Sequence, residues 1–306
     1  DMLDALAASA RQSGLAFLDL AETESTTPMP GYTHLQRAMP SSVGLWAASF
    51  AEQIADALSL VEVTRALCNR SPLGTAAGYG VNLPLDREGV ARELEFDALL
   101  HNPMAAQASR GALEVAVLHA AWQLLGAVRR FAWDLSLFTT SEFGFVTLEE
   151  ALTTGSSLMP QKRNPDVVEL MRGAAGVVQG AIVELMSVLS LPSGYHRDLQ
   201  LTKAPLIRGL DEALATMNMV PRVVRGMRLD KERMRAAITP ECFATDRAVE
   251  LAQQGIPFRE AYRQVAAELA AKSQELTGDA DASLRARVSP GGPGALELAL
   301  LRARYA

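Results

Sequence analysis

The sequence predicts an all-α fold in which long helices pack into a bundle, and three observations lead to this prediction. Apolar residues recur at helical spacing along nearly the whole chain. No segment shows the alternation of apolar and polar residues, bounded by hairpin turns, that is typical of a half-buried strand. The longest helical segments would reach roughly 35 to 50 Å at about 1.5 Å per residue, which is the length of helices in a bundle.

The expected helices follow in order along the chain. The sequence opens on DMLDALAASARQSGLAFLDLAE, which has the pattern of a helix already under way. Further long helices are expected over residues 41–67, 106–137, 165–189 and 205–227, the last with an interruption near Pro221 because proline cannot donate a helical hydrogen bond. After about Arg228 the helices become shorter and more charged. We therefore expect a central long-helix bundle domain over residues 1–229 and a small C-terminal helical domain over residues 230–306.

Residues 173–192 form the most apolar segment of the chain. The stretch GAAGVVQGAIVELMSVLSLP is apolar almost all round, which is typical of a membrane span or of a helix buried on every side. Gln179 and Glu184 lie inside it and favour burial within protein. We therefore expect this helix to pack against other copies of the chain in a homo-oligomeric helical core.

Charge and cysteine usage exclude several classes of function. The chain of 306 residues has a formal net charge of −6 and no run of basic residues, which argues against binding to nucleic acid or a membrane surface. Cys68 and Cys242 have no metal-ligand spacing and indicate neither a disulfide framework nor a metal site. The sequence shows no signal peptide, and we expect the protein in the cytoplasm.

The stretch TTGSSLMPQKRNPDVVELMRG, residues 153–173, combines a mobile serine loop with the start of a helix. Asn164 precedes a proline and an aspartate, and this order is typical of a helix N-terminus, so Asn164 could simply be a cap. The backbone amides around Ser156 and Ser157, the Lys162 ammonium and the Asn164 side chain could also hold an anion together. The stretch therefore predicts an anion site before this helix.

The string GSSLMPQKRNPD resembles the signature of the fumarase/aspartase superfamily, whose members eliminate fumarate from a substituted succinate. Its MPQKRNPD form is most similar to the argininosuccinate lyases. Other blocks are similar to that family in the same order: MPGYTHLQRAMP (29–40), SPLGTAAGYG (71–80), SEFGFVTL (141–148), YHRDLQLTK (195–203) and FATDRAVELAQQGIPFREAY (243–262).

The resemblance implies a C–N lyase of arginine biosynthesis that releases arginine and fumarate by β-elimination, with no metal and no organic cofactor. It implies that Ser156 is the base, with Ser157 as the alternative, and that Lys162 and Asn164 stabilise the doubly charged carboxylate of the intermediate. The same resemblance gives His34 the protonation of the leaving group, because histidine titrates near neutral pH. It also implies that Glu169 contacts this histidine from another subunit.

Substrate-binding residues follow from the same resemblance. Thr33 is expected to hold a succinyl carboxylate, and Gln36 is a further candidate beside it. Tyr195, Gln200 and Lys203 are expected to contact the carboxylate and the arginine moiety. Three arginines could equally be surface or interface cations: Arg110, Arg197 and Arg208.

The chain departs from the family pattern at several positions. His196, Leu201 and Thr202 replace more usual residues, Tyr262 stands where histidine is usual, and residues 102–115 retain little of the family block beyond Ser109 and Arg110. Nothing in the sequence resembles the family's N-terminal domain of about a hundred residues, which we therefore expect to be absent from this chain.

Two alternatives to an argininosuccinate lyase stay open at this point. The chain could be another fumarate-releasing lyase of the superfamily, similar to adenylosuccinate lyase, or a non-catalytic, crystallin-like helical oligomer. The resemblance implies a homotetramer in which several subunits build each active site around a small-molecule substrate.

Overall fold

The computed structural model describes residues 1–271 and 276–306, and these residues form twelve α-helices connected by short strands and turns. This confirms the all-α prediction. The helices are α1 (Met2–Thr23), α2 (Val43–Cys68), α3 (Arg87–Glu93), α4 (Pro103–Ala108), α5 (Ala112–Phe138), α6 (Asp166–Val188), α7 (Lys203–Arg225), α8 (Lys231–Ala236), α9 (Ala244–Gln253), α10 (Phe258–Ala271), α11 (Ala280–Ala286) and α12 (Leu298–Ala303).

The strands pair two by two within the described residues. They are β1 (Pro28–Thr33) with β2 (Gln36–Ser42), β3 (Arg70–Ser71) with β4 (Ala98–Leu99), β5 (Val146–Leu148) with β8 (Met227–Leu229), and β6 (Thr154–Gly155) with β7 (Arg163–Asn164). The β3–β4 pair is parallel, and the other three described pairs are antiparallel. Short 3₁₀ helices cover Ala76–Gly78, Glu150–Leu152, Arg197–Thr202 and Pro240–Phe243.

The chain divides into two compact units. Unit 1 comprises Asp1–Gly14, Gln53–Asp134 and Asp166–Arg222, and unit 2 comprises Leu15–Glu52, Leu135–Pro165 and Val223–Ala306. Helices α1, α2, α5 and α7 run from one unit into the other, whereas α6 belongs wholly to unit 1. The domain boundary expected at residues 229/230 stays a prediction.

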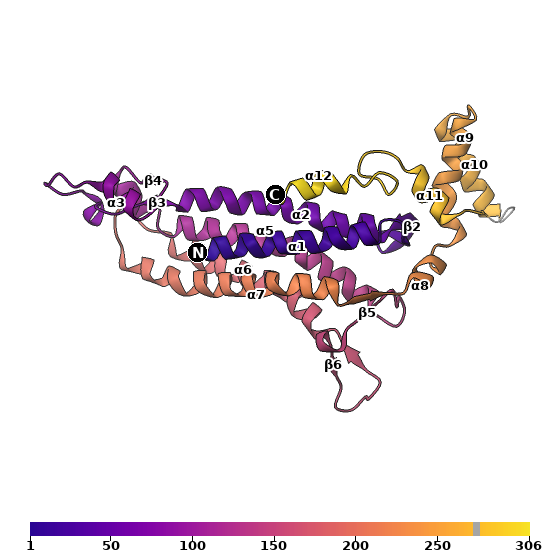
Figure 1. Ribbon diagram of the computed structural model, residues 1–306, viewed down its shortest axis with the longest axis horizontal. Coiled ribbons are helices and arrows are strands. Elements are labelled where there is room, and N and C mark those ends of the chain that lie inside the picture. Colours follow the sequence, from indigo (N-terminus) through magenta and orange to yellow (C-terminus); the bar gives the residue numbers. More distant parts are fainter. Residues whose placement is uncertain (272–275) are drawn as a thin grey trace. The chain divides into compact units, whose positions relative to one another are not determined.

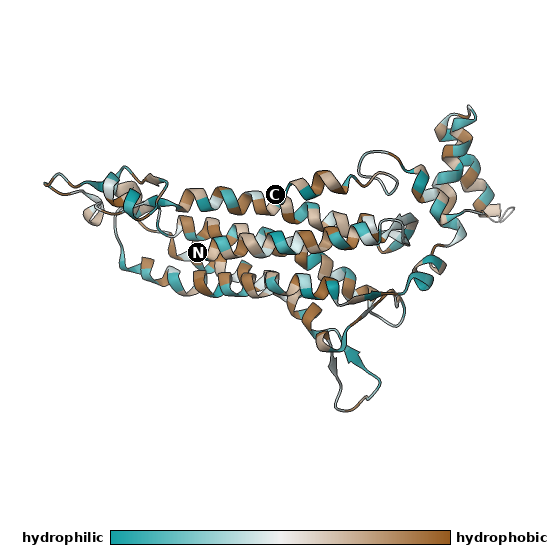
Figure 2. Cartoon of the chain, viewed as in Figure 1, coloured by the Kyte–Doolittle hydropathy of each residue, from teal (hydrophilic) through white to brown (hydrophobic). Residues whose placement is uncertain are grey.

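In unit 1, segments of α1, α2, α5, α6 and α7 lie side by side as a helix bundle (Figure 1). Apolar residues recur along these helices (Figure 2), and their inward faces are fully buried. Each buried leucine contributes about 1.5–3 kcal/mol of hydrophobic stabilisation. The largest fully buried side chains of the unit are Phe131, Leu6, Ile54, Leu118, Leu124, Leu125, Leu185 and Met217.

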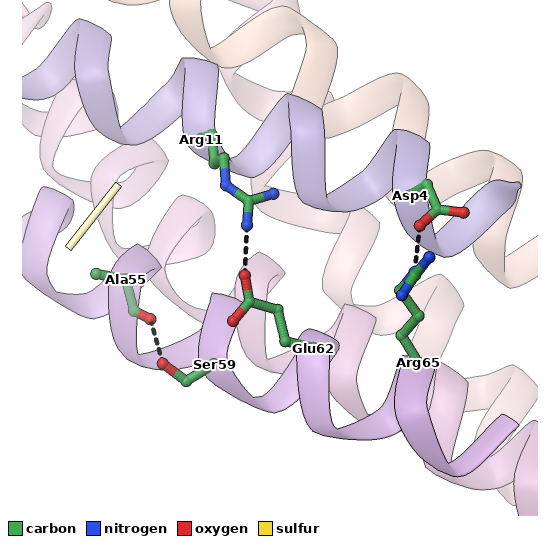
Figure 3. Close-up of polar contacts among 6 residues, drawn as sticks. All are labelled: Asp4, Arg11, Ala55, Ser59, Glu62 and Arg65. Atoms are coloured by element: carbon green, nitrogen blue, oxygen red, sulfur yellow. Dashed lines mark hydrogen bonds and ion pairs between the residues drawn. The ribbon is translucent and has the colours of Figure 1, made fainter. Parts of the chain in front are cut away.

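Ion pairs connect α1 and α2 at the surface of unit 1. Arg11 of α1 pairs with Glu62 of α2, and Arg65 of α2 pairs with Asp4 of α1 (Figure 3). All of these side chains are exposed to solvent, so each pair contributes only about 0–1 kcal/mol. The buried apolar face, and not the ion pairs, holds the two helices together.

Unit 2 is built around an aromatic cluster and carries the β1–β2 hairpin. Phe50 packs edge-to-face on Trp46, with ring centroids 5.5 Å apart, and Phe138 lies 5.7 Å from Trp46. In the C-terminal part, α9 and α10 pack through a small apolar core of Ala248, Leu251, Ala261 and Val265.

The long helices agree with the sequence prediction to within a few residues, apart from two differences. The helix expected over 106–137 is divided by a turn at Ser109–Gly111, where Gly111 has a φ of +84°. The interruption expected near Pro221 is wrong, because α7 continues through it. Pro221 cannot donate to the carbonyl oxygen of Met217 one turn earlier. The Ser13 hydroxyl lies 2.8 Å from the Ser9 carbonyl oxygen and 3.1 Å from the Met217 carbonyl oxygen, so its one hydrogen is shared between the two.

Helix α6 has one buried face and one exposed face. Its buried face includes Val168, Met171, Ala174, Val178 and Leu185, whereas Leu170 is 74% exposed. Of the described helices, none is both long enough and apolar enough to cross a membrane.

Candidate active site

His34 lies at the tip of the β1–β2 hairpin. The strands pair antiparallel with Thr33 opposite Gln36, so His34 and Leu35 form a two-residue turn. Both have left-handed backbone conformations, with φ of 54° and 59°. Such turns normally use asparagine and glycine, and the conformation costs a residue with a side chain roughly 1–2 kcal/mol. Strain of this kind is concentrated at functional sites.

The His34 side chain is exposed, as are Thr33 and Gln36 on either side of the turn. Within residues 1–271 and 276–306, the His34 imidazole has no hydrogen bond or ion pair, which leaves both ring nitrogens available to a substrate. The sequence shows no strand pattern around His34, but these residues form an antiparallel hairpin whose register shifts between Pro30 and Tyr32.

Gln36 lines a pocket of about 540 Å³ beside the hairpin. Tyr32 and Phe143 form part of its wall, with ring centroids 5.5 Å apart. Burial raises the pKa of the Tyr32 hydroxyl above its ordinary value, so this hydroxyl stays protonated near neutral pH.

The serine loop is held between β6 and β7. Thr154 pairs with Asn164 and Gly155 with Arg163, so the strands fix both ends of the loop. The Asn164 side-chain amide donates to the Gly155 carbonyl oxygen at 3.4 Å, so it bridges the two strands. Ser156, Ser157, Lys162 and Asn164 therefore lie in, or at the end of, one short loop between paired strands.

Ser156 and Ser157 have different surroundings within this loop. The backbone amides of Leu158 and Met159 donate to Ser156 Oγ at 3.3 and 3.1 Å, and Ser156 is half-buried. Ser157 is exposed. Hydrogen bonds donated to a hydroxyl oxygen favour its deprotonated form, so the geometry favours Ser156 over Ser157 as the base.

Lys162 is exposed at the end of the same turn, where its backbone amide donates to the Met159 carbonyl oxygen at 3.0 Å. This hydrogen bond fixes the backbone of Lys162, and the exposed side chain can extend its ammonium toward an anion.

The remaining candidates belong to unit 1. Glu169 is exposed on the first turn of α6, and Lys203 is exposed at the start of α7. Gln200 donates to the Tyr195 hydroxyl at 3.3 Å. Hydrogen bonds from Gln200 and then Arg197 lower the pKa of Tyr195 below its ordinary value.

Arg110 joins this group in the structure. Its guanidinium lies over the Tyr195 ring, 5.5 Å from the centroid. The sequence left Arg110 open between a surface cation and a site residue. One feature of the sequence favoured a role in the site. Arg110 matches the family block in a stretch, residues 102–115, that otherwise departs from it.

Two of the departures from the family pattern have a structural account. Thr202 is buried, and its hydroxyl lies 3.4 Å from the Glu114 carboxylate and donates to the Leu199 carbonyl oxygen at 3.0 Å. Tyr262 is exposed. Among the described residues, no cluster of histidine, cysteine and carboxylate side chains could hold a metal ion.

Comparison with known proteins identifies the family. A family model described as lyase matches residues 2–180. An argininosuccinate lyase of Sorangium cellulosum (strain So ce56) is 66% identical over 298 residues, which cover 97% of this chain and 69% of that protein. An argininosuccinate lyase of Xanthomonas campestris pv. campestris (strain B100) is 48% identical over 305 residues, covering 100% of this chain and 70% of that protein.

Solved structures support the fold. EDDS lyase in complex with formate has a TM-score of 0.88 at 24% identity and covers 99% of this chain and 67% of its own. The 3-carboxy-cis,cis-muconate lactonizing enzyme from Pseudomonas putida has a TM-score of 0.79 at 20% identity, covering 100% of this chain and 72% of its own. With the sequence matches over nearly its whole length, the chain belongs to the lyase family and, within it, to the argininosuccinate lyases.

Proposed function

We propose that this chain catalyses the cleavage of argininosuccinate into arginine and fumarate, a step of arginine biosynthesis in the cytoplasm. The observation that carries the proposal is the 66% identity to an argininosuccinate lyase over 97% of the chain. The serine loop supports it, because Ser156 accepts two backbone hydrogen bonds in a turn that also carries Lys162.

The reaction begins with removal of a proton from the carbon next to a succinyl carboxylate. Deprotonated Ser156 takes this proton, and the electron pair that remains spreads onto the carboxylate. The carboxylate then carries two negative charges, which form only where positive charge and hydrogen-bond donors are already in place. Lys162, Asn164 and the loop amides provide them.

The carbon–nitrogen bond breaks in the second step. The electron pair on the carboxylate side forms the double bond of fumarate, and the pair of the breaking bond stays on the guanidino nitrogen. Because the bond pair stays on this nitrogen, the substrate's guanidinium would become a neutral guanidine. His34 supplies a proton to that nitrogen, so arginine leaves as a guanidinium cation. Proton transfer and electrostatic stabilisation are sufficient, and no cofactor takes part.

Two groups of residues are proposed to contact the substrate, in a site that different copies of the chain share. Thr33 and Gln36 bind a succinyl carboxylate beside His34. Tyr195, Gln200 and Lys203 bind the other carboxylate and the arginine moiety, and Arg110 joins them because it stacks on Tyr195.

The site is completed by other copies of the chain in a homotetramer, with Glu169 of one copy next to His34 of another. Support comes from the exposed side of α6, where Leu170, Val183 and Met186 face outward. An added Cβ at Gly173, Gly176 or Gly180 would meet nothing within 4 Å, which leaves room for a second helix to approach closely.

Fumarate absorbance tests the proposal directly. The full-length protein is given argininosuccinate, adenylosuccinate, malate and aspartate in parallel, and we expect fumarate from argininosuccinate alone. Faster release from adenylosuccinate would support the neighbouring-lyase alternative. Absence of release from all four substrates, in a protein with a normal helical spectrum, would support the non-catalytic alternative.

A further inference from the structure

Glu24 is the one acidic or basic side chain that is buried among the residues that the structure describes, at 9% exposure. Its Oε2 accepts hydrogen bonds from the Thr27 hydroxyl and from Lys231 Nζ, the latter at 2.6 Å. The proposed chemistry makes no use of Glu24. Burying a carboxylate is costly, so its presence here calls for a physical reason.

Glu24 lies at the base of the hairpin that carries His34. Its carbonyl oxygen accepts from the backbone amides of Thr27 and Gly44, at 3.1 and 3.0 Å. Thr27 directly precedes β1, and its own carbonyl accepts from Val43, which directly follows β2. The backbone and the side chain of Glu24 together close the end of the hairpin opposite His34.

Lys231 brings the C-terminal part of unit 2 to this point. It is the first residue of α8, which packs against β1. Arg233 of the same helix donates to the carbonyl oxygens of Ser141 and Glu142, at 2.6 and 3.2 Å. Helix α8 is thus fixed on the segment 141–142 and, through Lys231, on the hairpin base.

We propose that Glu24 and Lys231 are a positioning pair that sets where the tip of the hairpin, and with it His34, lies. A two-stranded hairpin is marginally stable alone, so its direction depends on what holds its base. The left-handed His34–Leu35 turn likewise persists only where surrounding structure holds it. Only the Glu24 side of this pair is buried. A buried charge that must keep its partner is best supported as a device that fixes one arrangement among several. This inference rests on the proposed function.

The test compares variants of the full-length protein. Lys231→Met removes the charge from a side chain that is 57% exposed, so folding is retained more readily than in Glu24→Gln. We expect Lys231→Met to lower kcat by about tenfold or more with KM changed by less than about twofold, because misplacing a catalytic group costs mainly kcat. Lys231→Arg should restore most of the loss, since the arginine keeps the charge.

Arg302→Met is the matched control. Arg302 pairs with Asp19 and Glu22 in the same unit, at 2.8 and 3.0 Å, and does not bind the hairpin base. We expect it to lower thermal stability without lowering kcat. If Lys231→Met and Arg302→Met lower thermal stability alike and both leave kcat unchanged, the positioning role is overturned.

Hydrogen exchange of the segment 28–42 separates this inference from the proposed function. Lys231→Met should speed exchange there, and Arg302→Met should not. If the wild-type protein releases no fumarate, the proposed function fails, and faster exchange in Lys231→Met alone still supports the positioning of the hairpin. Unchanged exchange in Lys231→Met would overturn the inference whether or not the protein is active.

Discussion

Lys162 shows how much depends on the shape of a single cation. The loop places it directly after the turn that Ser156 closes, and its side chain is free in solvent. We expect Lys162→Met to lower kcat by about 10²- to 10³-fold, as for loss of one donor to a developing anion. Lys162→Arg should not restore it, because the guanidinium is larger and planar. Initial rates of fumarate release measure both variants, and full activity of Lys162→Arg would show that charge alone is enough.

Leu35 is strained in a way that glycine would relieve. Its φ is 59° and its side chain is 68% exposed, so little packing is lost on truncation. Glycine avoids the left-handed penalty of roughly 1–2 kcal/mol but adds about 0.5–1 kcal/mol of backbone entropy in the unfolded chain. We expect Leu35→Gly to raise the free energy of unfolding by about 0.5–1 kcal/mol in urea titrations. Leu35→Ala is the control and should give no gain, and a destabilised Leu35→Gly would mean that the Leu35 side chain stabilises the hairpin.

Residue types predicted part of the site. The chemistry of the serine loop could be inferred because hydroxyl, ammonium and amide groups are close together in sequence. The left-handed turn at His34–Leu35 could not, since leucine rarely adopts such a conformation and the pair lacks the asparagine and glycine that normally indicate this turn. Arg110 could not be assigned either, because its partner Tyr195 is far away in the chain and only folding brings them together.

At the scale of elements, a hydrogen bond from α1 to α7 compensates for the helical hydrogen bond that Pro221 cannot make. Pro221 leaves the Met217 carbonyl oxygen without its helical donor, and the buried Ser13 hydroxyl of α1 lies 3.1 Å from it. We expect Ser13→Ala to lower the free energy of unfolding by about 1–3 kcal/mol, since a buried carbonyl loses its partner.

A double-mutant cycle tests this account of α7. Pro221→Ala supplies a backbone amide for Met217, so Ser13→Ala should cost clearly less in the Pro221→Ala background than in the wild type. Equal costs in the two backgrounds, measured by urea unfolding, would show that Ser13 does not compensate for the proline.

Helices were predictable from the sequence and the hairpin was not. Apolar residues at a spacing of about 3.6 located α2, α6 and α7 to within a few residues. Strand β1 contains two prolines and a glycine and lacks alternation, so its pattern is that of a loop. Its pairing with β2 is supported by contacts with α8 and by the Glu24–Lys231 pair at the closed end of the hairpin. These contacts join residues that are far apart in the sequence.

At the scale of the whole molecule, we predict that the exposed side of α6 forms the interface between copies of the chain. A change of Leu170 and Val183 to glutamate places charge on the exposed apolar side of α6, and we expect light scattering to show dissociation of the oligomer. Leu300→Glu on α12 is the control, because Leu300 is similarly exposed, at 66%, and lies on another helix. An oligomer that persists in the α6 variant would place the interface elsewhere.

The central claim is that Ser156 removes the carbon-bound proton of argininosuccinate, and one comparison tests it most directly. Turnover is measured by fumarate absorbance for full-length Ser156→Ala and Ser157→Ala at saturating substrate. We expect Ser156→Ala to lower kcat by about 10²- to 10⁴-fold with little change in KM, and Ser157→Ala to stay within about tenfold of the wild type. Near-wild-type turnover in Ser156→Ala, together with loss of turnover in Ser157→Ala, would contradict the account.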